Sequence, residues 1–186
     1  MPDDLDVTAL THVNFAFAYF DPTTFEVTPM SNSDIPLYTK FTGLKARKPS
    51  LQTWIAIGGW VFNDPGNSPD TRTAFSDMSR TSDNRKAFIH SLVQFMETYN
   101  FDGVDIDWEY PSADDRGGDA SDMQNFVYLL QDMRSYFGDK YGISATLPSS
   151  YWYLRGFDLQ GMSRYVDWLN VMTYVSFSCT NSETTS

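Results

Sequence analysis

Short runs of apolar residues alternate along this chain with longer stretches in which apolar positions recur every three or four residues. The short runs are rich in β-branched and aromatic residues, stop at turn-forming residues, and span 13–20, 51–57, 103–110, 143–147 and 166–174. Each run predicts a strand that is mostly buried on both faces. Strands that alternate with helices are typical of a parallel sheet with helical connections.

The stretches between these runs predict helices, because their apolar residues fall on one helical face. They lie around 37–44, 88–99 and 123–137, with shorter helices near 75–78 and 159–162. Ser82 or Asp83 is expected to cap the start of the second helix, and Gly138 to close the third. We interpret the Met and aromatic stripes on these helices as core-facing surfaces.

Two architectures fit this alternation: an open doubly wound sheet and a (β/α) barrel. Neither G-x-G-x-x-G nor G-x-x-x-x-G-K-[ST] follows any of the strands. The commonest sequence reasons for a nucleotide-binding sheet are therefore missing. In either architecture the functional residues are expected beyond the carboxyl ends of the strands.

Composition narrows the classes of partner. The 186 residues carry 13 Lys+Arg against 24 Asp+Glu, a formal net charge of -11, which disfavours nucleic acid and anionic membranes. The sequence has no run of about eighteen apolar residues that would predict a transmembrane helix. The acidic start, MPDDLDV, lacks the apolar segment of a signal peptide. Neutral ligands, sugars among them, stay open.

The most informative segment is FDGVDIDWEYP at 101–111. Because side chains alternate along a strand, Asp105, Asp107 and Glu109 are expected on one face, with Glu109 at the carboxyl-terminal lip. Three like charges on a buried strand cannot all ionise cheaply, so at least one proton should be retained near neutral pH. A retained proton at a cleft is what a general acid requires, and glycoside hydrolysis is the chemistry most often built this way.

Other interpretations of this segment are weaker. A solvated acidic loop would not interleave Val, Ile and Trp, and a calcium loop would carry Gly at its sixth position. A carboxylate site for Mg²⁺ or Mn²⁺ stays open, although His12 precedes a strand, His90 lies within a helix, and both are interpreted as structural. Cys179 has no identifiable base partner.

At these residues the sequence resembles glycoside hydrolase family 18, the chitinases. Residues 102–109 fit that family's D-G-x-D-x-D-x-E signature at every fixed position, and the resemblance runs from about residue 10 to 174. Shorter matches are A-I-G-G-W at 56–60, M-T-Y at 172–174 and F-A-F-A at 15–18. The segments 113–118 and 151–153 look most like fungal chitinases related to the killer-toxin α-subunit group.

The resemblance implies a TIM barrel that hydrolyses β-1,4 links in chitin with retention. It implies that Glu109 protonates the glycosidic oxygen and that the substrate's own N-acetyl oxygen attacks the anomeric carbon. Asp107 would orient that acetamido group, Asp105 would share its proton, and Tyr174 would hydrogen-bond the acetamido carbonyl. No metal or organic cofactor is implied. The residues implied to line the sugar cleft are Phe17, Gly59, Trp60, Tyr110 and Met172.

The extent of the resemblance predicts an incomplete barrel. Strands two to six of eight are accounted for, so 1–174 is predicted to be a partial catalytic domain and 175–186 a polar tail unlike the family. A TIM barrel typically needs about 250 residues. The Val175–Ser176 pair can be encoded as a splice-donor sequence, which suggests translated intron from Val175 onward; sequencing the transcript across Tyr174 tests this. A longer N-terminus with a leader, and an extracellular location, are expected on family grounds.

Three functions follow: an enzyme, a chitinase-like lectin that holds chito-oligosaccharide without cutting it, and an inactive fragment. The intact Glu109 favours the enzyme over the lectin. Chitin or chito-oligosaccharide is the expected partner, with no obligate protein partner indicated. An unclosed barrel is expected to expose two parallel-strand edges and an apolar interior, which would make the chain poorly stable or aggregation-prone.

Overall fold

The computed structural model describes residues 1–174, in which six strands form one sheet in the order β2-β1-β3-β4-β5-β6. All neighbouring pairs are parallel except β1 and β2, which form an antiparallel hairpin. The strands are β1 (His12–Phe20), β2 (Val27–Pro29), β3 (Gln52–Gly58), β4 (Gly103–Asp107), β5 (Gly142–Pro148) and β6 (Trp168–Met172).

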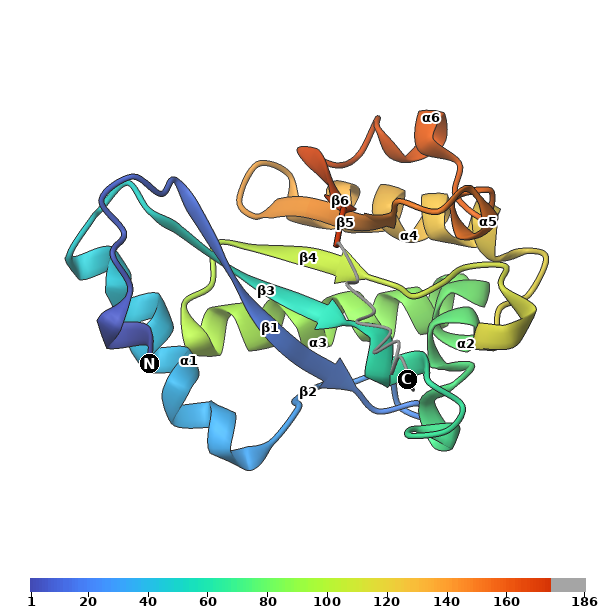
Figure 1. Cartoon of the computed structure of the whole chain (residues 1–186), viewed down its shortest axis with the longest axis horizontal. Coiled ribbons are helices and arrows are strands. Elements are labelled where there is room, and N and C mark those ends of the chain that lie inside the picture. Colours follow the sequence, from blue (N-terminus) through green and yellow to red (C-terminus); the bar gives the residue numbers. More distant parts are fainter. Residues whose placement is uncertain (175–186) are drawn as a thin grey trace, which may run out of the picture.

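Helices connect the parallel strands, as the alternating pattern predicts. They are α1 (Ile35–Thr42), α2 (Ala74–Arg80), α3 (Ser82–Tyr99), α4 (Asp122–Phe137), α5 (Tyr151–Leu154) and α6 (Leu159–Met162). In Figure 1, α3 and α4 run behind the fan of strands. The parallel strands follow one another in chain order, without the reversal that defines a doubly wound sheet. The fold is therefore an incomplete TIM barrel.

The sheet curls strongly at the end where the strands begin. The ring of His12 on β1 lies 4.7 Å from that of Trp168 on β6, although three strands separate β1 from β6. Trp54 of β3 stacks on Trp168 at 4.3 Å. Gly142 makes room for the indole of Trp54, because a Cβ at Gly142 would meet a ring atom at 2.0 Å. His12 is thus structural, as expected, although it begins β1 instead of preceding it.

Most residues of the helical stripes form the core, as interpreted, but Met123 at the start of the third stripe is exposed. Phe75 and Met78 of α2 are fully buried, as are most apolar residues of α3 and α4. Gly138 closes α4 as predicted, at φ +54°. The predicted cap of α3 is wrong: Thr81, not Ser82 or Asp83, accepts the hydrogen bond from the Asn84 N–H, at 3.1 Å.

The prediction that each strand is mostly buried on both faces is confirmed only for the three central strands. Nearly every residue of β3, β4 and β5 is buried, whereas most residues of β1 and β6 are partly exposed because their inner faces border the open side of the sheet. The expected apolar interior is also wrong in part. The middle of the concave face is polar, and carries Asp105, Ser144, Thr146 and Asn170.

Some of the sequence predictions concern residues beyond 174, which the structure does not describe. The tail at 175–186, with Cys179, lies outside the described residues, so the division of the chain at residue 174 stays a prediction. His90 is exposed on α3. Within residues 1–174, no helix is both long and apolar enough to cross a membrane.

Candidate active site

The carboxyl row lies on the concave face of the sheet, as the alternation of side chains predicts. Asp105 and Asp107 are the last inward-facing residues of β4, and Glu109 follows just beyond the strand's carboxyl end. The residues between them face the helices instead. Trp108, for example, stacks on Phe75 of α2 with ring centroids 5.3 Å apart.

Asp105 is held by neighbouring strands. Its carboxylate accepts hydrogen bonds from the hydroxyls of Ser144 (2.5 Å) and Thr146 (2.8 Å) on β5. The amide of Asn170 on β6 donates a third at 3.0 Å. Burial raises the pKa of Asp105, and these three donors oppose that rise. The Asp105 side chain is therefore fixed in position at the inner end of the row.

Asp107 is buried with less compensation. Its Oδ1 atom has no hydrogen-bond partner among residues 1–174. Burial, and then the charges of Glu109 and Asp105, raise its pKa to about 8. The expectation that the row retains a proton near neutral pH agrees with this value.

Glu109 is also buried, with 5% of its surface exposed. Burial raises its pKa, while a hydrogen bond with the Tyr110 side chain and the positive charge of Arg116 lower it. Burial in turn raises the pKa of Tyr110. The Tyr110 hydroxyl therefore stays protonated and available as a donor.

Two adjoining hollows open onto this row. The inner hollow, about 490 Å³, is lined by Asp105, Asp107 and Phe17 among others. The rim hollow, about 380 Å³, is lined by Glu109, Tyr110 and Trp60. Both are lined by Met172 and Tyr174, and together we call them the cleft. Eight of the nine residues implied by the family resemblance line it: Phe17, Trp60, Asp105, Asp107, Glu109, Tyr110, Met172 and Tyr174.

Gly59, the ninth residue, lies behind Phe17. A Cβ at Gly59 would meet the Phe17 ring at 2.8 Å, and the residue has φ +88°, so only glycine is accommodated. Its N–H donates to the backbone carbonyl of Asp107 at 2.9 Å. Gly59 therefore ties the end of β3 to the carboxyl row.

Arg116 is a site residue that sequence reasoning missed. It is 3% exposed, and its guanidinium lies 3.7 Å from the centre of the Trp60 ring. Its Nε donates to the backbone carbonyl of Glu109 at 3.0 Å, and Nη2 donates to that of Trp60. A carboxylate oxygen of Asp64 lies 3.7 Å from Nη1 of Arg116 and balances its charge. One buried cation thus fixes both the Trp60 ring and the backbone at Glu109.

The partners of Asp105 were also missed, although a signal for two of them exists. Ser144 and Thr146 are two residues apart on a predicted strand, so strand alternation places them on one face. The sequence around Arg116 has no such periodic spacing, because this residue lies in the irregular segment 113–118. Within residues 1–174, the His, Cys, Asp and Glu side chains form no group of three placed to hold a metal ion.

Sequence comparison finds many chitinases. Chitotriosidase-1 of Mus musculus is 32% identical over 182 residues, 93% of this chain and 37% of the relative. The killer toxin subunits alpha/beta of Kluyveromyces lactis are 37% identical over 123 residues, 64% of this chain and 10% of that protein. The chain thus spans well under half the length of these relatives. The resemblance to the killer-toxin group is confirmed.

Solved structures agree with the fold. The Ostrinia furnacalis Group IV chitinase in complex with allosamidin matches with TM-score 0.82 and 28% identity, over 93% of this chain and 45% of the other. A chitinase-like agglutinin from Robinia pseudoacacia matches with TM-score 0.79 and 30% identity, over 95% and 52%. The sequence profile described as glycosyl hydrolases family 18 matches residues 2–185. That match covers nearly the whole sequence, and the chain therefore belongs to family 18 of the glycosyl hydrolases.

Proposed function

We propose that this chain carries the catalytic centre of a chitinase, which hydrolyses β-1,4 links between N-acetylglucosamine units with retention of configuration. The observation that carries the proposal is the position of Glu109, buried beyond the carboxyl end of β4 in a hollow that Trp60 and Tyr110 also line. This is the end of the strands at which barrel enzymes carry their catalytic groups.

Glu109 acts as the general acid. Its raised pKa favours the protonated form, which can give a proton to the glycosidic oxygen as the bond to the leaving sugar breaks. The substrate's acetamido oxygen attacks the anomeric carbon, so no protein carboxylate acts as the nucleophile. This attack forms an intermediate in which the acetamido oxygen is bonded to the anomeric carbon. Glu109, now ionised, then removes a proton from the water molecule that opens the intermediate.

The neighbouring groups support the acetamido group. Asp107 lines a hollow large enough for a sugar ring, and its carboxyl group accepts the acetamido N–H. Asp105 shares the proton held in the row, since burial raises the pKa of both aspartates. Tyr174 lines the same hollow and donates to the acetamido carbonyl as charge develops there.

The test is release of a fluorophore from an N-acetyl-chito-oligosaccharide conjugate by this chain and by its Glu109→Gln variant. We expect Gln to lower kcat by about 10²–10⁴-fold, because it cannot donate the proton. Glu97→Gln is the matched control, since Glu97 lies on α3 in an exposed pair with Lys140, and it should keep full activity. Equal activity of the Glu109→Gln variant and its parent would refute Glu109 as the acid.

A second candidate function is chito-oligosaccharide binding without hydrolysis. The similarity to a chitinase-like agglutinin favours it, although Glu109 is retained here. Binding of chito-oligosaccharide by the parent chain with no release of fluorophore would support this candidate against the enzyme. We also expect an extracellular location, on family grounds; finding the protein only inside cells would contradict it.

A further inference from the structure

Arg116 belongs to a short turn that packs against the segment after β3. In the turn Asp114–Arg116, the Arg116 N–H donates to the Ala113 carbonyl at 2.9 Å. The Arg72 side chain donates to the Asp114 carbonyl at 2.9 Å and ties the turn to its neighbour. Arg116 is the one buried residue of the turn, so its guanidinium points into the protein while the two acidic side chains stay outside.

The guanidinium of Arg116 bridges the segments that leave two neighbouring strands. Trp60 follows β3 and Glu109 follows β4, and their backbone carbonyls accept hydrogen bonds from Nη2 and Nε of Arg116. The same planar group lies against the Trp60 ring. Because the donors of a guanidinium are fixed in one plane, they hold the two carbonyls and the ring at a set spacing. Trp60 and Glu109 both line the rim hollow, so this spacing decides how the ring and the acid meet a bound sugar.

Arg116 also acts on the acid through its charge. The titratable side chains around Glu109 are those of Asp107, Tyr110, Arg116, Tyr153 and Tyr174. Arg116 is the one cation among them. Burial raises the pKa of Glu109, while the hydrogen bond with Tyr110 and the charge of Arg116 lower it. The carboxylate of Asp64, which pairs with Arg116, offsets part of this positive charge.

We propose that Arg116 is a positioning residue for the hydrolysis, and that its guanidinium keeps the Trp60 ring and the Glu109 carboxyl facing the same hollow. The inference rests on the proposed function. Arg116 is 3% exposed, so it acts through these two neighbours and not by contact with the substrate.

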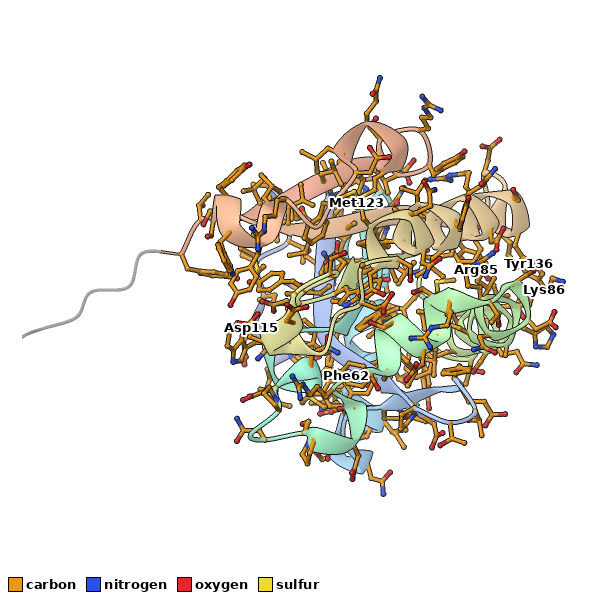
Figure 2. All side chains as sticks on the ribbon, turned by 90° about the vertical axis from the view of Figure 1, so that its right-hand side faces the viewer. Phe62, Arg85, Lys86, Asp115, Met123 and Tyr136 are labelled. Atoms are coloured by element: carbon orange, nitrogen blue, oxygen red, sulfur yellow. The ribbon has the colours of Figure 1, made fainter. Side chains whose placement is uncertain are left out.

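Arg85 offers a matched control, because it is held in a similar way at a distant place. Its Nε donates to Asp132 at 2.7 Å, and its guanidinium lies 5.6 Å from the centre of the Tyr128 ring. Its side chain is 11% exposed. Figure 2 shows Arg85 far from Asp115, the residue before Arg116 in the chain. Loss of Arg85 therefore removes a largely buried cation without changing the cleft.

The test is the pH dependence of kcat/KM for release of the fluorophore from the N-acetyl-chito-oligosaccharide conjugate. Arg116→Met keeps the length of the side chain but removes its charge and its donors. It should lower kcat/KM by about 10²-fold, because the acid and the Trp60 ring lose their set spacing. It should also move the high-pH limb of the profile to higher pH, because Glu109 without its neighbouring cation keeps its proton to a higher pH.

Arg116→Lys separates the charge from the geometry. Lysine keeps the positive charge but cannot form the planar fork, so kcat/KM should stay low while the high-pH limb returns toward that of the parent. Arg85→Met should change neither quantity, even where it lowers the melting temperature. Thermal melts identify the variants that are folded at the assay temperature. If Arg116→Met is not folded, the comparison of Arg116→Lys with the parent decides.

The outcomes separate the two proposals. Equal kcat/KM in the parent and in both Arg116 variants would overturn the inference and leave the proposed function standing. Equal losses in Arg116→Met and Arg85→Met would also overturn it, as would a high-pH limb that stays in place in Arg116→Met, because a purely structural loss lowers the rate at every pH alike. No release by the parent, or equal release by its Glu109→Gln variant, would overturn the proposed function, and the inference with it.

Discussion

Among single residues, Asp107 makes the stability of the fold depend on pH. Its pKa is raised from 3.8 to about 8 in the folded chain, so the folded state keeps a proton that the unfolded state loses across this interval. The stabilisation that this bound proton gives the folded state is fully present below pH 3.8 and is lost as the pH rises through about 8. Each pKa unit corresponds to about 1.4 kcal/mol, so the free energy of unfolding should fall by a few kcal/mol.

Thermal melts at several pH values within this interval check the prediction. The melting temperature of the parent should fall as the pH rises, and that of Asp107→Asn should fall less, because its amide does not titrate. Asp70→Asn is the control, since Asp70 is exposed, and should follow the parent. The same dependence on pH in the parent and in Asp107→Asn would contradict the role given to Asp107.

The residues of the cleft differ in how far their places could be predicted. Period-two alternation places Asp105, Asp107 and Glu109 on one face, because a strand leaves side chains only two directions. The same rule reaches Ser144 and Thr146 once the neighbouring strand is known. Arg116 could not be found in this way. Its place depends on the path of an irregular segment, which no periodic pattern encodes.

At the scale of elements, Asp122 joins three parts of the fold. It is the first residue of α4 and is fully buried. Its carboxylate accepts hydrogen bonds from the Ser76 hydroxyl on α2 at 2.8 Å and from the backbone N–H groups of Ser112 and Asp119 at 3.2 and 2.6 Å. It thus anchors both ends of the segment that carries Arg116 and Asp115.

Asp122→Ala should therefore lower the free energy of unfolding by about 3 kcal/mol, because one buried donor and two partly buried donors lose their acceptor. Denaturant melts measure this change. Asp139→Ala is the control, since Asp139 is exposed just after α4, and should cost under about 0.5 kcal/mol. A similar cost for both substitutions would show that the Asp122 network does not hold the segment.

The existence of the strands was easier to predict than their lengths. The run at 103–110 keeps one period-two alternation throughout, yet β4 ends at Asp107, where its pairing with Gly58 of β3 also ends. Composition cannot reveal that point, because pairing partners decide where a strand stops. β2 was missed for a related reason. Three residues show no period, and β2 forms because it pairs with the end of β1 and because Ser91 accepts the N–H of Val27.

For the whole molecule, the two edges of the sheet differ in their exposure to other chains. The β2 edge is only three residues long and ends at Pro29, which lacks a backbone N–H. The β6 edge is longer, and within residues 1–174 no strand pairs with β6 on the side away from β5. Val171 on β6 is 54% exposed. An open edge with an exposed β-branched residue is a template for pairing with a second chain.

We therefore expect the isolated chain to self-associate through β6, and sedimentation velocity over a range of concentrations measures this. Val171→Lys should shift the distribution toward monomer, because a charge on the edge opposes strand pairing. Leu159→Lys on α6 removes a similarly exposed apolar side chain away from the edge and should leave the distribution as in the parent. A parent chain that sediments as a monomer and melts cooperatively would show instead that β6 is protected from pairing.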